Sequence, residues 1–263
     1  MKERPTFPAR LNFAGGTPAP RRTEVSAVRP ASFAIQAAPV RIQTAASAMD
    51  SSAVRARMVH RLLEQGLSDA AVITAMRGVE RHRFVDSALG SQAYEDTSLP
   101  IGLGQTISKP SVVSRMAELL RNGIDGKLGR VLEIGTGCGY QAAVLSYLAT
   151  EVYSIERLRG LHDKARENLR YFRVPNLHLL FGDGMLGFAK GAPYAGIIAA
   201  AGGEAVPLAW IEQLAVGGRL VAPVSPSGGS KKQVLMVIDK TAHGIQQTVL
   251  EAVHFVPLKS GVA

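Results

Sequence analysis

Short apolar segments alternate with amphipathic helical segments through most of the sequence beyond residue 130. The apolar segments predict strands at 131–134, 151–155, 177–181, 196–200 and 219–224. Helices are predicted between them at 141–148, 158–172 and 207–215, the last one closed by Gly217 and Gly218. Segments 234–239 and 246–255 have no helical pattern between them and predict an antiparallel pair. This order indicates the α/β class: an open, mostly parallel sheet with helices on both faces and an antiparallel edge hairpin.

Upstream of this alternation, the sequence predicts two further helices. The first is expected to begin at Asp50 or Ser51 and to end at Gly66. The second, at 70–77, is expected to be capped by Ser68. The first helix carries Val54, Met58, Leu62 and Leu63 at helical spacing.

A long irregular segment follows, at residues 84–110, and it is rich in Gly, Pro, Ser and Thr. A helix resumes at Pro110, whose fixed φ suits the first helical turn. Loops this long are uncommon in compact domains unless they have a function. We therefore expect segment 84–110 to contribute to a functional site.

Residues 1–50 differ from the rest in composition. They carry seven Lys and Arg residues against three acids, and six of the fourteen prolines. Prolines this frequent remove too many backbone donors for a helix or a central strand. The chain is therefore predicted to consist of a disordered basic extension, 1–50, and a folded domain, 51–263. The extension lacks the apolar core of a signal peptide, although an Arg-rich, acid-poor segment is compatible with an organellar transit peptide.

The formal net charge of +9 raises the question of nucleic-acid binding. Almost half of that excess lies in residues 1–50, and aromatic residues make up only 6% of the chain. No segment interleaves aromatic with basic residues, so we expect no nucleic-acid partner. No uncharged apolar run reaches the roughly 18 residues of a membrane helix, and the single cysteine cannot form an internal disulfide. We expect a cytoplasmic protein without a membrane partner, and a monomer.

The strongest local signal is Val131-Leu132-Glu133-Ile134-Gly135-Thr136-Gly137-Cys138-Gly139-Tyr140, a strand that runs into a glycine-rich turn and a helix. Glycines in such a turn let a ligand lie against backbone N–H groups. A dinucleotide fingerprint needs a third glycine where this chain has Tyr140, and the Glu133 carboxylate would repel a pyrophosphate. A positively charged ligand without phosphates, such as S-adenosylmethionine, suits this acid better.

Two further acids follow the next two strands. Glu156 lies 21 residues beyond Gly135, where a carboxylate can accept hydrogen bonds from both hydroxyls of a ribose. Asp183 is placed to accept from an adenine amino group, and Gly184 lets the ring approach. Because the carboxyl ends of neighbouring parallel strands converge on one crevice, we expect these acids and Glu133 to line one pocket.

Several motifs together form a recognisable pattern over roughly residues 53–258. The most specific is segment 94–110, which contains the block Gly104-Gln105-Thr106-Ile107-Ser108. The glycine loop belongs to the pattern, as do Arg83-Phe84-Val85, Tyr153-Ser154-Ile155-Glu156-Arg157, Gly182-Asp183-Gly184 and Phe255-Val256-Pro257-Leu258. This pattern resembles the protein-L-isoaspartate O-methyltransferases. The resemblance implies the Rossmann-like fold of class I S-adenosylmethionine-dependent methyltransferases.

The resemblance also implies an activity and its site. A methyl group would pass from S-adenosylmethionine, which leaves as S-adenosylhomocysteine, to the α-carboxylate of an L-isoaspartyl residue in a damaged protein or peptide. The ester would expel methanol to give a succinimide that partly reopens as normal aspartate. Ser108 is the catalytic serine by motif match, and no metal is expected. The cofactor-binding residues are expected to be Thr106, Ile107, Glu133, Gly135, Thr136, Gly137, Gly139, Glu156, Arg157, Asp183 and Gly184.

The chemistry of the residues agrees with this assignment. A substrate carboxylate, with a reference pKa of about 4, is already ionised at pH 7, so no general base is needed. The site must align that carboxylate and strip water from it. We assign the Ser108 hydroxyl as the donor that orients it, with Thr106 and Ile107 shaping a lid; the alternative role of Ser108 is a helix cap ahead of Pro110. A Ser-His-Asp site is unsupported, because the histidines are scattered and no nucleophile-elbow motif occurs.

The main departure from the family pattern is Ala195, where an acid is usual in the fourth strand. Its loss is expected to remove one polar contact at a strand end and to affect activity more than fold. Cys138 replaces a frequent Ser or Thr and is expected to be a small loop residue without a redox role. Two other functions stay open: methylation of another carboxylate or a small molecule with the same donor, and a catalytically weak scaffold that binds the donor.

Overall fold

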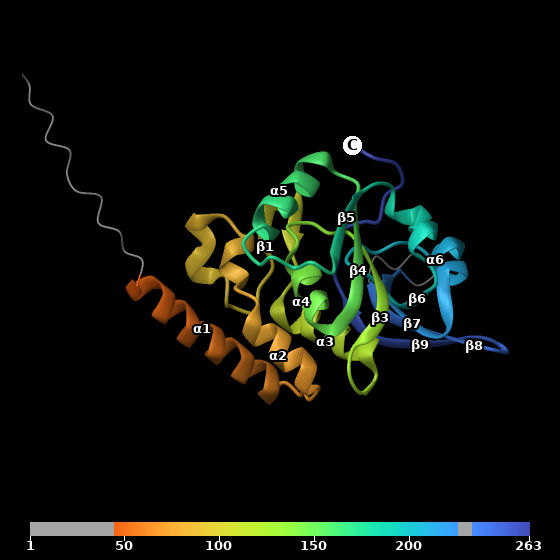
Figure 1. The fold of residues 1–263 in the computed structure, drawn as a ribbon, viewed down its shortest axis with the longest axis horizontal. Coiled ribbons are helices and arrows are strands. Elements are labelled where there is room, and N and C mark those ends of the chain that lie inside the picture. Colours follow the sequence, from red (N-terminus) through yellow and green to blue (C-terminus); the bar gives the residue numbers. More distant parts are fainter. Residues whose placement is uncertain (1–44, 226–232) are drawn as a thin grey trace, which may run out of the picture. The chain divides into compact units, whose positions relative to one another are not determined.

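A seven-stranded sheet forms the centre of the structure, a computed structural model that describes residues 45–225 and 233–263 (Figure 1). The strands lie in the order β5-β4-β3-β6-β7-β8-β9. Their bounds are β3 Leu128–Ile134, β4 Ala149–Glu156, β5 Leu177–Phe181, β6 Tyr194–Ala199, β7 Leu214–Val224, β8 Gln233–Thr241 and β9 Gly244–Val253. The pairs from β5 to β7 are parallel, whereas β7–β8 and β8–β9 are antiparallel. The predicted mostly parallel sheet with an antiparallel edge pair is confirmed.

Helices cover both faces of this sheet. The α-helices of the described residues are α1 Ala45–Glu64, α2 Ala70–Gly78, α3 Pro110–Arg121, α4 Tyr140–Leu148, α5 Arg159–Leu169 and α6 Leu208–Gln213. Met116 of α3 and Leu145 of α4 share a buried core with Val131 of β3. Trp210 of α6 belongs to another core, with the adjacent β3 residue Leu132. Successive strand residues point to opposite faces, so both faces of β3 are covered, as the apolar run in its sequence predicted.

The first helix begins earlier than expected. α1 starts at Ala45, so neither Asp50 nor Ser51 is its N-cap, and the predicted boundary between residues 50 and 51 falls inside the helix. The prediction failed because the last proline of the N-terminal region is Pro39, and the alanine-rich sequence after it favours a helix. The rest of the predicted extension, residues 1–44, lies outside the described residues.

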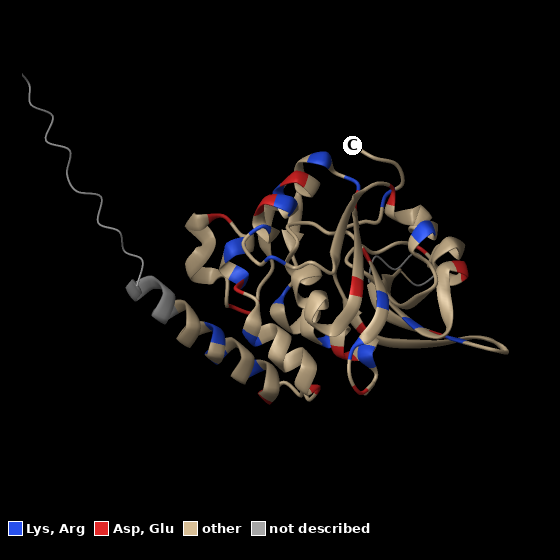
Figure 2. Cartoon of the chain, viewed as in Figure 1, with Lys and Arg blue, Asp and Glu red and all other residues tan. Residues whose placement is uncertain are grey.

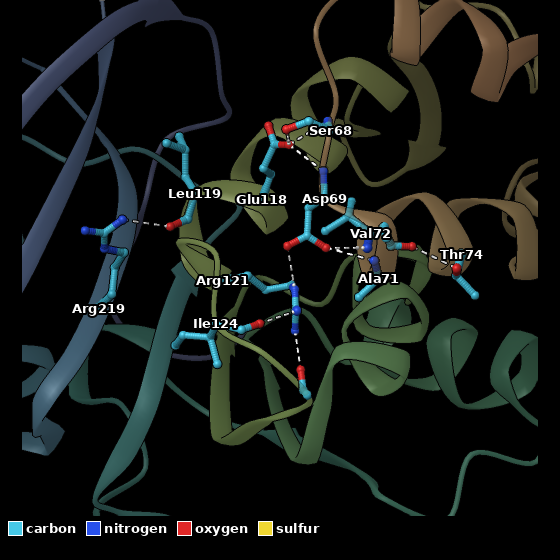
Figure 3. Close-up of polar contacts among 12 residues, drawn as sticks. Ser68, Asp69, Ala71, Val72, Thr74, Glu118, Leu119, Arg121, Ile124 and Arg219 are labelled. Carbon is cyan, nitrogen blue, oxygen red and sulfur yellow. Dashed lines mark hydrogen bonds and ion pairs between the residues drawn. The ribbon is translucent and has the colours of Figure 1, made fainter.

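Asp69, and not Ser68, caps α2. One carboxylate oxygen of Asp69 accepts from two N–H groups in the first turn of α2, at 2.9 and 3.0 Å. The other accepts from Nε of Arg121 at 2.8 Å, which ties α2 to the end of α3 (Figure 3). Ser68 instead donates from its N–H and its hydroxyl to Glu118 of α3. Both residues are good caps, and the contact with α3 decides between them.

The segment expected to be irregular contains regular structure. Two 3₁₀ helices, η1 Arg81–Phe84 and η2 Ser87–Gln92, precede a hairpin of β1 Leu99–Gly102 and β2 Gln105–Ile107. The hairpin is an antiparallel sheet of its own, separate from the central one. Nζ of Lys164 in α5 donates to the carbonyl oxygen of Ile101 at 2.9 Å, so the hairpin lies against α5 (Figure 1). We call residues 96–111, which include this hairpin and Ser108, the flap.

β7 is longer than predicted. Gly217 and Gly218, expected to close a helix, lie inside this strand, and α6 already ends at Gln213. Along β6, Tyr194 pairs with Leu214 but Gly196 pairs with Arg219, so β7 carries extra residues at a bulge. Glycine is common at such bulges because the backbone bends there, and the glycine pair therefore marks an irregular strand. Residues 226–232, which follow β7, lie outside the described residues.

Candidate cofactor and substrate site

A cavity of about 460 Å³ lies where β3 and β4 end, between the central sheet and the flap. The flap provides seven of its lining residues, from Ile101 to Ser108. Others come from the end of β3, the glycine loop and the start of α4, from the end of β4 and the start of α5, from Val113 of α3, and from Gly184 and Ala200-Ala201. The chain's last segment closes the cavity through residues 256–259. Crevices at the carboxyl ends of parallel strands are the usual ligand sites of such sheets.

The glycine loop after β3 has a conformation that only glycine adopts readily. Gly135, Gly137 and Gly139 have φ values of 90°, 57° and 93°. The N–H groups of Gly135 and Thr136 donate to the carbonyl oxygen of Ile155, at 2.9 and 3.1 Å. The N–H of Gly139 donates to the carbonyl oxygen of Thr136 at 2.9 Å. These donors are engaged within the protein, so they do not form the open cradle of N–H groups that a phosphate requires.

Glu156 fixes the loop from the end of the neighbouring strand. Its Oε2 accepts from the N–H of Gly137, and its Oε1 from the N–H of Leu158, both at 2.9 Å. The side chain is 5% exposed and lines the cavity. A carboxylate has about four acceptor positions, so two remain for donors from a ligand. Glu156 therefore holds the loop and can bind hydroxyl groups at the same time.

Glu133 lies beneath the loop and does not line the cavity. It is completely buried, and its Oε2 accepts from the Ser154 hydroxyl at 2.5 Å. Ser154 in turn shares a hydrogen bond of 2.6 Å with the hydroxyl of Thr136. Burial raises the pKa of Glu133 to about 8, against the lowering effect of the Ser154 hydrogen bond. With this pKa the carboxyl group is mostly protonated at pH 7 and carries little charge with which to attract a cationic ligand.

Asp183 is held by the main chain. It caps η3, Gly184–Leu186, where its Oδ1 accepts from the N–H of Met185 at 2.8 Å. Its Oδ2 accepts from the N–H of Gly261 at 2.6 Å. Asp183 does not line the cavity, although Gly184 does. The hydrogen bond from Gly261 therefore holds the last residues of the chain at the end of β5, where the adenine ring was expected to bind.

Ser108 lies on the flap and lines the cavity. The N-cap of α3 is Lys109, and no side chain at that position caps the helix. Within the described residues, the Ser108 hydroxyl has no hydrogen-bond partner, so the alternative role of this serine as a helix cap is wrong. Its side chain is half-buried beside the cavity. A half-buried hydroxyl without a partner is available to a ligand.

The structure therefore brings together most of the predicted residues. Ser108 and eight of the eleven predicted cofactor residues line the cavity: Thr106, Ile107, Gly135, Thr136, Gly137, Glu156, Arg157 and Gly184. Glu133, Gly139 and Asp183 lie outside its lining. Sequence reasoning missed Lys259, an exposed lining residue without a hydrogen bond or ion pair among the described residues. The only sequence signal was its position directly after the family segment 255–258.

Two residues depart from the family pattern: Ala195 lies outside the cavity lining, and Cys138 is part of it. Ala195 is the second residue of β6, whereas the cavity is lined by Ala200 and Ala201 beyond the other end of that strand. The acid that is usual at position 195 would therefore not lie in the cavity lining, and its absence removes no polar group from the cavity. Cys138 is buried, and burial raises the pKa of its thiol to about 11, so it stays protonated at neutral pH.

The remaining surface offers few other sites. Among the described residues, no group of three or more His, Cys, Asp or Glu side chains could hold a metal ion. None of the helices in the described ranges is long and apolar enough to span a membrane. Basic and acidic residues are interspersed over the described part of the chain, as Figure 2 shows. The cavity is thus the best-defined candidate site.

Comparisons with known proteins agree with this geometry. The sequence profile of the family described as protein-L-isoaspartate(D-aspartate) O-methyltransferase matches residues 53–263. A protein of Methylibium petroleiphilum named protein-L-isoaspartate O-methyltransferase is 57% identical over 264 residues, which is 98% of this chain and 96% of that protein. A protein of the same name from Leptothrix cholodnii is 59% identical over 82% of this chain and 76% of its own length.

Solved structures show the same arrangement. One named protein-L-isoaspartate O-methyltransferase is 28% identical, with a TM-score of 0.71, and the match covers 79% of this chain and 67% of that one. A putative enzyme of this name from Plasmodium falciparum, solved with S-adenosyl-L-homocysteine, has a TM-score of 0.65 at 23% identity, over 77% of this chain and 97% of its own. The second likeness is evidence for the fold alone. From the profile and the full-length relatives, the chain belongs to the protein-L-isoaspartate(D-aspartate) O-methyltransferase family.

Proposed function

We propose that this protein transfers a methyl group from S-adenosylmethionine to the α-carboxylate of L-isoaspartyl residues in damaged proteins and peptides. One observation carries the proposal: the hydroxyl of Ser108, which has no protein partner, and the carboxylate of Glu156 line the same cavity. Ser108 lies on the flap side of the cavity, and Glu156 lies on the sheet side. The first suits an anionic acceptor, and the second suits the sugar of the methyl donor. Family membership supports both assignments.

The cavity suits S-adenosylmethionine. Its volume of about 460 Å³ lies within the usual range for ligand pockets. Within the loop, the donors of Gly135, Thr136, Gly137 and Gly139 are engaged by protein acceptors, which favours a ligand without phosphates. When bound, S-adenosylmethionine supplies a methyl group on a positively charged sulfur. The residues that would hold it are Thr106, Ile107, Gly135, Thr136, Gly137, Glu156, Arg157 and Gly184, with Glu133, Gly139 and Asp183 supporting them from outside the lining.

The chain's own residues have to orient the acceptor and exclude water. An α-carboxylate is ionised at pH 7 and needs no general base, so alignment is the main task. The Ser108 hydroxyl donates a hydrogen bond to one carboxylate oxygen and leaves the other free to attack. The apolar side chains of Ile101 and Ile107 are buried and line the cavity, where they exclude water from the carboxylate. Lys259 and Arg157 add positive charge to the lining, which favours an anionic substrate.

A labelling experiment tests this function. The purified protein is incubated with radiolabelled S-adenosylmethionine and with two peptides that differ only in an aspartyl or an L-isoaspartyl residue. We expect base-labile label on the isoaspartyl peptide alone. Label on both peptides, or on a small carboxylic acid in preference to either, would support a methyltransferase of other specificity. Cofactor binding in calorimetry without transfer to any acceptor would support a scaffold.

We also propose that the protein acts as a monomer in the cytoplasm. The single cysteine of the sequence gives the chain no internal disulfide to form in an oxidising compartment. Light scattering after size-exclusion chromatography tests the first point against the mass of 27.9 kDa. Fractionation of the source cells, followed by immunoblotting, tests the second.

A further inference from the structure

The flap cannot hold its own position. Its hairpin is a two-stranded sheet that shares no strand pairing with the central sheet. An isolated two-stranded hairpin is marginally stable in water, yet the flap built on this one supplies Ser108 and six other residues to the cavity lining. Contacts with the rest of the protein must therefore fix where Ser108 lies.

One side chain joins the two ends of the flap. Oδ1 of Asp96 accepts from the N–H of Ser111 at 2.9 Å, and Oδ2 accepts from the Ser111 hydroxyl at 2.8 Å. Asp96 lies three residues before β1, and Ser111 lies three residues after Ser108. This pair, the Asp96–Ser111 clamp, therefore closes the flap into a loop with both strands and Ser108 inside it.

The clamp also replaces a missing helix cap. The N-cap of α3 is Lys109, which has no capping side-chain acceptor, and Pro110 is the first helical residue. Asp96 reaches the second residue, Ser111, from outside the helix and supplies the acceptor and the negative charge that a helix N-terminus favours. Because Ser108 lies two residues before Pro110, a shift of the clamp would move its hydroxyl.

The backbone around Asp96 is held by a buried arginine, Arg81. Arg81 is completely buried. Its Nε donates to the carbonyl oxygen of Ala93 at 2.8 Å, and its Nη2 to that of Thr97 at 3.3 Å. Its guanidinium also lies 4.8 Å from the ring centre of Tyr140, which lines the cavity next to the glycine loop. The backbone on either side of Asp96 is thus held by Arg81, next to the cofactor side of the site. The start of α3 at Ser111 is joined to that backbone by the Asp96 side chain.

We propose that Asp96 is a positioning residue for methyl transfer: its two hydrogen bonds to Ser111 hold the Ser108 hydroxyl at the reacting carboxylate. This inference rests on the proposed function. Asp96 is exposed and does not line the cavity, so it acts through Ser108 and does not contact the cofactor or the substrate.

The test compares steady-state kinetics of four variants with an isoaspartyl peptide. Asp96→Ala removes both acceptors, and we expect kcat to fall about tenfold, because misplacement of a reacting group by about 1 Å is costly. Asp96→Asn keeps one acceptor and gains one donor for the Ser111 hydroxyl, so kcat should return to within about twofold of wild type. Ser111→Ala keeps the N–H contact and should lose about threefold. Asp96→Ala/Ser111→Ala should be no slower than Asp96→Ala alone.

Asp86→Ala is the matched control. Asp86 is also an exposed capping residue, which accepts from the N–H of Ala88 ten residues before the flap, and it does not line the cavity. Its loss should leave kcat within about twofold of wild type. S-adenosylhomocysteine should bind Asp96→Ala within about threefold of wild type, because its Glu156 contact lies on the sheet. Any of three results would overturn the proposal. They are a wild-type kcat in Asp96→Ala, no rescue by Asp96→Asn, and a loss of cofactor affinity as large as the loss of kcat.

Amide hydrogen exchange gives a readout that needs no activity. Asp96→Ala should raise the exchange rates of the amides in residues 99–107 at least fivefold, with those of β3 and β4 unchanged, and Asp96→Asn should restore them. Unchanged exchange in the hairpin would overturn the clamp even if catalysis were slower. If the wild-type protein methylates no isoaspartyl peptide, the proposed function fails, whereas the exchange experiment still decides whether Asp96 holds the flap.

Discussion

The two sides of the cavity are built in different ways. On the sheet side, the glycine loop and Glu156 are held by hydrogen bonds between neighbouring parallel strands, most of them between main-chain groups. On the flap side, a two-stranded hairpin is held by side chains: Leu99, Ile101 and Ile107 are buried in an apolar core, and Lys164, Arg81 and Asp96 add polar contacts. The cofactor residues on the strand ends are therefore held mainly by the main chain, whereas the flap, which carries Ser108 together with Thr106 and Ile107, is held by side-chain contacts.

This difference has a consequence for catalysis. Sites on strands keep their geometry when a loop moves, whereas loops of this kind open and close on substrates. Substitution of the flap residue assigned to the acceptor, Ser108, should change turnover and leave cofactor affinity nearly intact. Substitutions on the sheet side should do the reverse. The following predictions test this separation, in order of expected effect.

The largest effect is expected from Ser108→Ala. Without its hydroxyl the acceptor loses its orienting donor, and kcat/KM should fall about 100-fold, with cofactor affinity within about twofold of wild type. Kinetics with an isoaspartyl peptide and calorimetry with S-adenosylhomocysteine measure the two quantities. Ser98→Ala is the control, because Ser98 is exposed on the same flap but does not line the cavity. Unchanged turnover in Ser108→Ala would remove the catalytic assignment.

The next effect is expected from Glu156→Ala, on the sheet side. Loss of two hydrogen bonds to a ribose, at about 1 kcal/mol each, weakens cofactor binding about 30-fold. The melting temperature should also fall, because the N–H groups of Gly137 and Leu158 lose their acceptor. Glu151→Gln is the control on the same strand, since its ion pair with Arg130 is exposed and worth little. An unaltered dissociation constant for S-adenosylhomocysteine in Glu156→Ala would count against the ribose role.

A smaller effect is expected from Lys259→Gln. This lysine adds a positive charge to the lining, so its loss should raise KM for an anionic isoaspartyl peptide about fivefold and leave kcat nearly unchanged. The increase should shrink at high salt, because exposed charges are screened. Lys190→Gln, an exposed lysine outside the lining, is the control. An equal KM at low salt in Lys259→Gln and wild type would exclude this role.

The smallest effect is expected from Glu133→Gln and concerns stability. Burial raises the pKa of Glu133 from 4.5 to about 8, so the folded protein binds a proton that the unfolded chain releases above pH 4.5. The stabilisation is complete below pH 4.5 and is lost as the pH rises through about 8. Wild type should therefore lose on the order of ten degrees of melting temperature between pH 5 and pH 9 relative to Glu133→Gln.

Thermal unfolding at several pH values, with Glu204→Gln as the exposed control, measures this difference. Parallel curves for wild type and Glu133→Gln would mean that the buried carboxyl group titrates normally. Turnover at pH 7 should differ little between them, because Glu133 is mostly protonated there and does not line the cavity.

The central sheet was predictable because its signals are local. The apolar run of β5 matches the structure at both ends, Leu177–Phe181, and the other predicted strands fall within the observed ones to within one residue, apart from the last. Buried parallel strands have apolar side chains on both faces, and this pattern does not depend on distant residues. The glycine loop and Glu156 followed from the same logic, because strand ends meet at one edge of a sheet.

The rest depended on contacts between residues far apart in the chain. The flap hairpin has strands of four and three residues, too short for a periodic pattern to show. The partner of Asp96 lies 15 residues away, and that of Asp183 lies 78 residues away. Glu133 was predicted at the right strand end, but whether a side chain lies on a cavity wall or beneath it depends on how the loop folds back over it.

The glycine loop also limits how this pocket could be re-engineered. A designer who wished to convert it to a nicotinamide site would begin with Tyr140→Gly, the change that completes the dinucleotide fingerprint. That change would not free the N–H groups of Gly135 and Thr136 from the carbonyl oxygen of Ile155, nor that of Gly137 from Glu156. To bind these N–H groups, a pyrophosphate would have to displace their present acceptors, Ile155 and Glu156, which belong to β4. Conversion therefore requires rebuilding the neighbouring strand end, and random point mutation of the loop alone should not reach it.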